Sequence, residues 1–353
     1  MTQSSVTDER ALPPFARKYL GSKRLLRGWI ADQITDRVGV PRSFLDGFFG
    51  TASISYEMAL RGVDRIVAVE ALRSNCVVLR GSCAARTGAQ SGERLDEVRR
   101  KLNALEPVRG YVVQSYADRY FTEKNCCRMD AIREEMERLL NAGEITIGEH
   151  EQLLASFILE ADRVANTIGQ YDAFLKNPHG PSSVGGRHLV DDRVQSPFRL
   201  RTLAPFPGRN VEVIEGDLVD LAPGIAVEVA YYDPPYNTRQ YCDNYHVLEN
   251  LARWEKPRLY GKTRKFERSG MKSPFSRRRD AAAALERLIM GTRAAYLFLS
   301  YSSEGILDPE TIALILSRRG QVQVSQRPYP VFGNGAGVSR RRNVVEYLFF
   351  VTG

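Results

Sequence analysis

The sequence predicts an α/β protein whose core is a doubly wound, mostly parallel sheet, with a largely helical second lobe inserted into it. Strand, loop and helix patterns alternate on both sides of a long insert, and such alternation is typical of parallel sheets with helices on both faces. Several expected strands end in an acidic residue, at the edge where open α/β sheets bind their ligands. We therefore expect one catalytic domain from residues 1–83 and 210–353, and an inserted domain at residues 84–209.

The composition is that of a globular protein with a basic net charge. Of the 353 residues, 43% are hydrophobic and 26% are charged, which is usual for a soluble protein. The 50 Lys and Arg against 42 Asp and Glu favour a polyanionic partner, although a basic protein without such a partner is the alternative. Five cysteines without a CxxC pair predict neither a disulfide framework nor a zinc site and fit a reducing cytoplasm. No apolar run approaches about 18 residues, so we expect no membrane span, and the polar start predicts no signal peptide.

The first expected element is a helix that follows the string KYLGSK, Lys18 to Lys23. Apolar residues recur at helical spacing from Leu25 to Ile34. Gly21 and Ser22 can form a turn and cap the helix, and free N–H groups at its start favour an anion such as a carboxylate. An ordinary helix start is the alternative interpretation of this string.

A glycine-containing loop and an acidic strand end come next. A strand from Ser43 to Asp46 leads into the loop Gly47 to Ser53, and a helix from Ile54 to Leu60 follows. Glycine allows the backbone to approach a ligand closely, and the helix start supplies free N–H donors. The strand Ile66 to Glu70 ends in an acid about 20 residues after the loop, where nucleotide-binding βαβ units bind ribose hydroxyls. A solvated Glu at the strand end is the alternative.

The insert is expected to be a mainly helical lobe. Apolar residues recur with a helical period at Leu95 to Leu105, Met129 to Leu140 and Leu153 to Val164. We expect a short strand or an aromatic loop at Tyr111 to Tyr116. Another loop is expected at Asn177 to Gly186, which is rich in Pro, Gly and Ser.

The most informative segment is a buried strand that ends in an acid, two prolines and an aromatic ring. Val211 to Asp217 restores the strand pattern, and Val229 to Tyr232 forms the next strand. The prolines that follow forbid both a continuing ladder and an immediate helix, so Asp233 is held at the carboxyl end of the strand. Its carboxylate, the carbonyl of Pro234 and the ring of Tyr236 suit an amino group on a planar heterocycle. A tight turn is the alternative, because Asp and Pro are common turn residues.

A basic segment follows the prolines. Residues Lys256 to Arg279 hold ten Lys or Arg and a single acid, with three aromatic residues between them. Loops that grip phosphates and stack on bases have this composition, although a solvated charge run is the alternative. The elements expected after it are helices from Asp280 to Met290 and through Ile312 and Leu316, and strands at Ala295 to Tyr301, Val322 to Val324 and Val344 to Val351.

These motifs and their order resemble a known enzyme family. Asp233-Pro234-Pro235-Tyr236 resembles motif IV of the amino-methyltransferases, with the Asp that is typical of the adenine branch. The KYLGSK string resembles motif X, the loop Gly47 to Ser53 resembles motif I, and Asp217 resembles the acid of motif III. The loop has Gly47 where the family usually has Pro and Ala52 where it usually has Gly, which predicts weakened cofactor binding. Over nearly its whole length the chain resembles the Dam-like, D12-class DNA adenine-N6 methyltransferases.

The resemblance implies a seven-stranded methyltransferase-type sheet, S-adenosylmethionine as cofactor, double-stranded DNA as partner, no metal, and target recognition by the insert. The catalytic residues that it implies are Asp233, Pro234, Pro235 and Tyr236. The cofactor-binding residues are Tyr19, Gly21, Lys23, Asp46, Phe48, Gly50, Thr51, Ala52, Glu70, Asp217 and Asp233. The expected DNA-binding residues are Lys262, Arg264, Lys265, Arg277 and Arg278, together with Asn166, Tyr171 and Lys176, for which packing or a surface role is an equal alternative.

The expected reaction is direct, site-specific methyl transfer to N6 of a flipped-out adenine, as part of a restriction-modification system. A C5-cytosine mechanism needs a nucleophilic Cys, typically after Pro, and the sequence has no Pro-Cys pair. We expect a cytoplasmic, nucleoid-associated monomer or weak dimer, with a cognate restriction endonuclease as a candidate partner. The alternatives are an N4-cytosine or RNA amino-methyltransferase, and a DNA-binding protein with a decayed cofactor site.

Overall fold

The computed structural model describes residues 11–85, 89–175, 191–331 and 342–352. Its sheet has seven strands in the order β3-β2-β1-β4-β5-β7-β6. All neighbours pair in parallel except those of β7, which runs antiparallel to both β5 and β6. The prediction of a mostly parallel, seven-stranded sheet is therefore confirmed. The strands are β1 (Ser43–Gly47), β2 (Arg65–Glu70), β3 (Asn210–Glu215), β4 (Ala226–Tyr232), β5 (Arg293–Ser302), β6 (Val322–Val331) and β7 (Arg342–Thr352).

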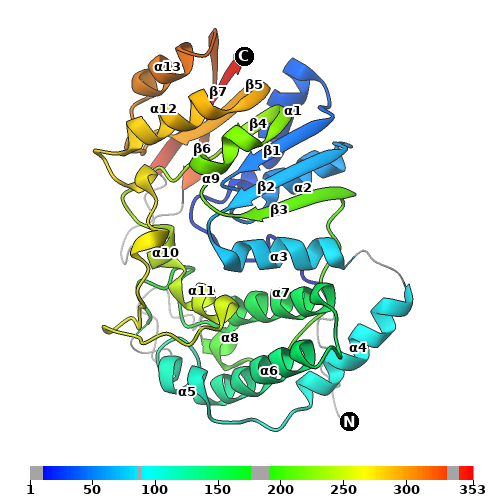
Figure 1. Ribbon diagram of the computed structural model, residues 1–353. Helices are drawn as coiled ribbons and strands as arrows, with labels where there is room; N and C mark the ends of the chain where they lie inside the picture. The colour runs from blue at the N-terminus through cyan, green and yellow to red at the C-terminus, as the bar shows by residue number, and fades with distance from the viewer. Residues whose placement is uncertain (1–10, 86–88, 176–190, 332–341, 353) are drawn as a thin grey trace, which may run out of the picture.

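Helices cover both faces of the sheet (Figure 1). Successive strand residues point to opposite faces, so Phe44 of β1 packs in the core beside Met58 and Leu79, whereas Leu45 packs in the core that contains Leu285. One face is covered by α1 (Arg27–Val38), α2 (Ser53–Leu60) and α3 (Arg73–Ala84). The other is covered by α9 (Leu218–Leu221), α12 (Ala281–Gly291) and α13 (Pro309–Ser317). This is a doubly wound arrangement, and the carboxyl ends of β1 to β4 meet at one edge.

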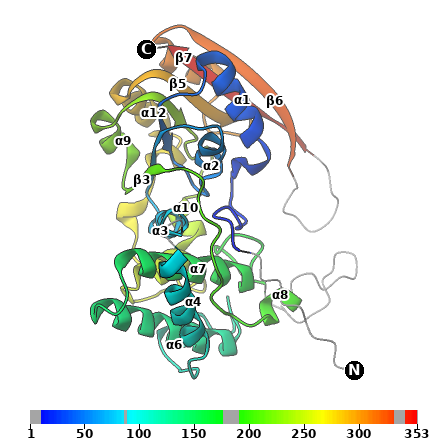
Figure 2. The ribbon, with the colours of Figure 1, turned by 90° about the vertical axis from the view of Figure 1, so that its right-hand side faces the viewer.

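The second lobe is helical, and two separate parts of the chain build it. The insert contributes α4 (Ala89–Asn103), α5 (Tyr111–Tyr116), α6 (Glu123–Asn141), α7 (Ile147–Val164) and α8 (Asp191–Gln195). The segment after β4 adds α10 (Tyr241–Asn244) and α11 (His246–Arg253), whose Leu248 and Leu251 share one core with Met129 and Phe157. Helix α3 packs along α7 and joins the lobe to the sheet, as Figures 1 and 2 show. No helix among the described residues has the length and hydrophobicity of a membrane span.

Residues Tyr111–Tyr116 form helix α5, so the prediction of a short strand or an aromatic loop was wrong. The carboxylate of Asp130 on α6 accepts hydrogen bonds from the backbone N–H groups of Gly110, Val112 and Val113 at 2.7–3.0 Å. These are the donors that a helix start leaves without partners. The cap comes from another helix, so the local Tyr and Val residues, which favour strands, gave no sign of it.

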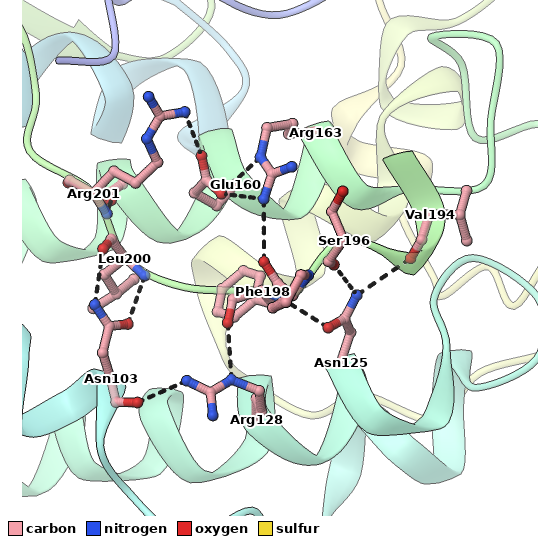
Figure 3. A network of polar contacts seen from close by, with 12 residues as sticks. Asn103, Asn125, Arg128, Glu160, Arg163, Val194, Ser196, Phe198, Leu200 and Arg201 are labelled. Atoms are coloured by element: carbon pink, nitrogen blue, oxygen red, sulfur yellow. Dashed lines mark hydrogen bonds and ion pairs between the residues drawn. The ribbon is translucent and has the colours of Figure 1, made fainter. Parts of the chain in front are cut away.

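The chain returns from the insert to β3 through an extended segment that belongs to no strand, residues 196–201 (Figure 3). Side-chain amides satisfy its backbone groups. Asn125 donates to the Ser196 carbonyl and accepts from the Phe198 N–H, and Asn103 makes the same pair of bonds with both backbone groups of Leu200. Because buried backbone groups need partners, these two asparagines fix the path by which the chain re-enters the sheet.

Candidate active site

A cavity of about 590 Å³ lies at the carboxyl ends of β1 to β4. This volume is within the usual range of a small-molecule site, about 300–1,000 Å³. The structure brings ten of the eleven predicted cofactor-binding residues to its wall: Tyr19, Gly21, Lys23, Asp46, Phe48, Gly50, Thr51, Glu70, Asp217 and Asp233. Pro235 also lines it, whereas Ala52 does not. Among the described residues no group of three or more His, Cys, Asp or Glu side chains could hold a metal ion.

The two departures from the family pattern leave the glycine loop intact. Ala52 has a left-handed backbone with φ of 57° and packs in the core below the loop, so its methyl group stays out of the cavity. At Gly47 a Cβ atom would lie 2.4 Å from Leu218 Cδ2 and 2.6 Å from the ring of Tyr232. The large residue at position 232 therefore requires the smallest one at position 47.

Replacing Gly47 with Ala is expected to lower the free energy of unfolding by about 1–3 kcal/mol, the usual cost of overpacking a core. Urea unfolding measures the change. The matched control is Gly28→Ala in α1, where an added Cβ atom has no neighbour within 4 Å and Ala is the better helix former. A Gly47→Ala protein as stable as the unchanged chain would contradict this account of the loop.

Glu70 joins the glycine loop to the end of β2. Its carboxylate accepts hydrogen bonds from the N–H of Gly50 at 3.0 Å, of Ala71 at 2.9 Å and of Leu72 at 3.1 Å. Burial raises the pKa of Glu70, and these backbone donors oppose the rise. The acid at the strand end is therefore a fixed part of the cavity wall, and a solvated surface Glu is excluded.

Asp46 is a second buried acid on the cavity wall. Its Oδ2 atom accepts hydrogen bonds from both the backbone N–H and the hydroxyl of Ser55, at 3.0 and 2.5 Å. Burial raises the pKa of Asp46 to about 7, although the Ser55 donors favour the carboxylate. This acid therefore changes charge near neutral pH.

Asp233 directly follows β4, and the two side chains that contact its carboxylate among the described residues both approach the same oxygen. Its Oδ1 atom lies 2.7 Å from the Nζ atom of Lys23 and accepts a hydrogen bond from the Ser300 hydroxyl at 3.0 Å. Burial raises the pKa of Asp233, and the Lys23 charge opposes this rise. Burial alone would lower the pKa of Lys23, but Asp233 and Glu346 raise it well above its usual value. Lys23 is therefore a permanent cation in contact with the acid.

The aromatic ring of the DPPY segment lies beside this ion pair. The Nζ atom of Lys23 is 5.6 Å from the centroid of the Tyr236 ring, within range of a cation–π interaction. The Tyr236 carbonyl accepts a hydrogen bond from the N–H of Ile306 at 2.8 Å, which fixes the backbone of the segment. Pro234 is buried behind it. The segment thus presents a carboxylate and a ring together beside Lys23.

Comparison with known proteins assigns the chain to a family. The model of the D12 class N6 adenine-specific DNA methyltransferases matches residues 19–313. The chain belongs to this family. It is 31% identical to the type II methyltransferase M.CviAII of Paramecium bursaria Chlorella virus 1, over 94% of this chain and 97% of that protein.

Two further relatives carry related names. The type II methyltransferase M.NlaIII of Neisseria lactamica is 30% identical over 89% of this chain and 92% of its own length. The modification methylase StsI of Streptococcus sanguinis is 29% identical over 95% of this chain but only 51% of its own length. The chain thus spans about half of the StsI methylase and nearly all of M.CviAII and M.NlaIII.

In this D12-class chain, two tyrosines that the sequence motifs missed hold the KYLGSK string in place. The hydroxyl of Tyr245 accepts a hydrogen bond from the N–H of Leu20 at 2.7 Å, and the hydroxyl of Tyr241 donates to the Leu20 carbonyl at 3.1 Å. The Tyr19 and Tyr245 rings stack with centroids 4.5 Å apart. The only signal in the sequence was the aromatic content of the segment after Tyr236, which named no partner for these rings.

The far end of the basic segment forms part of the cavity wall in this D12-class structure. The side-chain amide of Gln240 donates to the Ser273 carbonyl at 3.0 Å and accepts from the Ser273 N–H at 2.8 Å. Met271 and Phe275 line the cavity, and Phe275 meets Phe48 of the glycine loop edge to face, with centroids 5.1 Å apart. The segment predicted to contact DNA is therefore continuous with the wall of this cavity.

The basic-segment candidates for DNA contact lie outside the core. All five are exposed or half-buried: Lys262, Arg264, Lys265, Arg277 and Arg278. Lys265 forms an ion pair with Asp172 at 2.6 Å, and Arg277 forms one with Asp280 at 3.5 Å. Tyr120 of the helical lobe donates to the Thr263 carbonyl at 3.0 Å, so the lobe supports the segment that carries them.

The residues of the insert that were predicted to bind DNA contact other parts of the chain instead. Asn166 is buried, and its side-chain amide donates to the carbonyls of Arg119 and Leu175, both at 2.9 Å. Tyr171 is also buried, and its hydroxyl donates to Asp162 at 2.9 Å. These contacts favour the packing alternative for both residues. Lys176 lies outside the described residues.

Proposed function

We propose that this chain transfers a methyl group from S-adenosylmethionine to N6 of adenine at a specific site in double-stranded DNA. The observation that carries the proposal is the arrangement of Asp233. Lys23 and Ser300 both contact its Oδ1 atom, which leaves Oδ2 as the acceptor for an amino group. The acid stands on the wall of a cavity large enough for the cofactor.

The cavity wall offers a contact for each part of S-adenosylmethionine, and its chemistry and size fit the group. Glu70 is suited to the ribose hydroxyls, and Asp217, which resembles the motif III acid, to the region of the cofactor adenine. The KYLGSK string and Asp46 are suited to the methionine end, whose ammonium group pairs with a carboxylate. When bound, the cofactor supplies an activated methyl group on a sulfonium.

On the substrate side, the chain's own residues orient the amino group. The Asp233 carboxylate and the Pro234 carbonyl accept the two N–H bonds of N6 and localise its lone pair, and the Tyr236 ring stacks on the base. With the cofactor bound, N6 would use this lone pair to take the methyl group that the sulfonium supplies, and Asp233 would accept the proton that N6 loses. Adenine N6 must leave the duplex for this, at a cost of a few kcal/mol.

The basic segment, Lys256 to Arg279, would bind the DNA backbone. The inserted lobe, residues 84–209, would act as the target-recognition domain. Phosphate contacts of this kind bind without regard to sequence and weaken with salt. The type II names of the relatives support a role in a restriction-modification system, with a cognate endonuclease as partner. We extend the proposal to a monomer or weak dimer that acts in the cytoplasm on the nucleoid.

Cofactor affinity is expected to rise as the pH rises through about 7. The reason is Asp46, whose pKa burial raises to about 7. Below that pH it is neutral and cannot pair with the cofactor ammonium, and above it the carboxylate is formed. Calorimetric titration of the chain with S-adenosylmethionine at several pH values measures the effect. An Asp46→Asn variant should bind weakly at every pH, and a variant that keeps the pH dependence would contradict this role.

The proposal as a whole is tested by methyl transfer from labelled S-adenosylmethionine to unmethylated duplex DNA, with RNA of the same sequence as control. Label in DNA supports it, and label in RNA alone would favour the RNA amino-methyltransferase. Absence of both transfer and cofactor binding would favour a DNA-binding protein with a decayed site. The open cavity and the intact glycine loop argue against that alternative.

A further inference from the structure

Glu346 on β7 is a buried acid that no motif of the sequence includes. Its side chain has no exposed surface, and in the sheet Glu346 lies opposite Ser302 of β5 and Arg327 of β6. The Nζ atom of Lys23 lies 3.2 Å from its Oε1 atom. Beyond this ion pair, neither carboxylate oxygen has a hydrogen-bond donor in the part of the chain that the structure describes. A buried charge with so few partners adds little stability, so its place beside the catalytic acid calls for another explanation.

Lys23 is shared between two acids, because the same Nζ atom lies 2.7 Å from Asp233 and 3.2 Å from Glu346. When all three groups are ionised, one positive charge faces two negative ones. The attraction of Lys23 is then divided, and Asp233 keeps more of its negative charge for the N–H bond of a substrate. When Glu346 is neutral, the ammonium acts on Asp233 alone and weakens it as an acceptor.

We propose that Glu346 is a positioning residue of the methyl transfer, which through the shared Lys23 makes Asp233 the stronger acceptor for the N6 proton. This inference rests on the proposed function, in which Asp233 accepts that proton. Glu346 does not touch the substrate, and it changes no bond itself. Its effect depends only on whether its carboxyl group is charged.

The charge of Glu346 changes near neutral pH. Burial raises its pKa to about 7, and Lys23 opposes the rise. Below that pH Glu346 is neutral, and above it the shared arrangement with Lys23 is complete. We therefore expect the rate of methyl transfer to rise with pH, with a midpoint near 7.

The other charged and titratable groups near these residues do not reproduce this change. Burial raises the pKa values of Tyr231, Tyr236 and Tyr329, so these phenols stay neutral through the same range. The guanidinium of Arg327 lies over the ring of Trp29, with its Cζ atom 5.9 Å from the ring centroid. Asp46 does titrate near 7, but it acts on cofactor binding, so saturating cofactor removes its contribution from the measured rate.

The test is the single-turnover rate of methyl transfer to duplex DNA, measured with saturating S-adenosylmethionine from about pH 6 to about pH 8.5. The unchanged chain should show the rise with a midpoint near 7. The rate of the Glu346→Gln protein should not change with pH, and it should equal the low rate that the unchanged chain shows at the acidic end of the range. Near pH 8.5 the variant should therefore be about tenfold slower than the unchanged chain. This loss is smaller than the roughly 10²–10⁴-fold that removal of a direct general base costs.

Two variants separate this role from a structural one. Glu346→Asp keeps the charge and should keep the rise with pH, even at a lower rate. Glu304→Gln removes an exposed acid from the same region and should leave the profile unchanged. If Glu346→Gln retains the rise with its midpoint near 7, this inference is overturned while the proposed function stands. If the unchanged chain makes no N6-methyladenine in DNA, both are overturned.

Discussion

Replacing Asp233 with Ala is expected to lower the rate of methyl transfer by at least about 10³-fold, because the variant loses the acceptor that localises the N6 lone pair. Lys23 keeps Glu346 as a partner in this variant, so we expect the protein to fold. DNA binding should change little, since the basic segment lies on other elements. Single-turnover transfer and a DNA-binding titration measure the two effects separately.

The matched control is Asp220→Ala, which removes an exposed acid that pairs with Arg287 outside the cavity. This variant should keep its transfer rate. If Asp233→Ala still turned over within about tenfold of the unchanged chain, Asp233 could not be the acceptor for the amino group. A loss of DNA binding in step with the loss of transfer would also contradict the role that we assign to it.

Replacing Glu70 with Ala is expected to weaken cofactor binding by at least about 100-fold, which corresponds to about 2.7 kcal/mol. The carboxylate holds Gly50, Ala71 and Leu72 through their N–H groups, and a hydrogen bond to a charged group contributes about 1.5–3 kcal/mol. The variant therefore loses the ribose contact that we propose for Glu70 and the hydrogen bonds that shape the glycine loop. Calorimetric titration with S-adenosylmethionine measures the loss of affinity.

Glu212→Ala is the control for this experiment, because Glu212 lies on the neighbouring strand β3 and pairs with Arg65 on the surface. It should bind the cofactor as the unchanged chain does. Circular dichroism establishes whether each variant is folded. A folded Glu70→Ala protein with unchanged affinity would show that Glu70 neither binds the cofactor nor shapes the loop.

The parts of the fold that could be predicted from the sequence are those that local patterns encode. Each of the seven strands was expected from apolar or alternating residues, and Asp46, Glu70 and Asp233 could be placed because each lies in the last two positions of a strand or follows one directly. Parallel strands bring their carboxyl ends to one edge, so the sequence also predicted that these acids would meet. The cavity confirms that they do.

The contacts that could not be predicted join residues that are distant in the sequence. The Asp130 cap of α5, the pairing of Gln240 with Ser273 and the contact of Lys23 with Glu346 depend on the final packing. Lys23 lies in the KYLGSK string, but nothing in the sequence indicated Glu346 as its partner, and the other residues have no distinctive neighbour pattern. For the same reason the composition of residues 84–209 predicted helices but not that α11 would complete their core.

The cavity wall links the proposed cofactor site to the segment that we propose binds DNA. Ser273 and Phe275 belong to the basic segment, yet Gln240 ties them to the loop after the catalytic turn, and Phe275 contacts the glycine loop. If the basic segment shifts on binding DNA, as we propose, the shift would reach the cavity wall directly. The helical lobe supports the same segment through Tyr120.

The measurement that tests the account most directly is identification of the nucleoside that the chain methylates. Unmethylated duplex DNA is treated with the chain and S-adenosylmethionine, digested to nucleosides and separated by chromatography with mass detection. The account predicts N6-methyladenine, which should be absent when the Asp233→Ala protein is used. Label on cytosine N4, or N6-methyladenine made equally well by the variant, would contradict it.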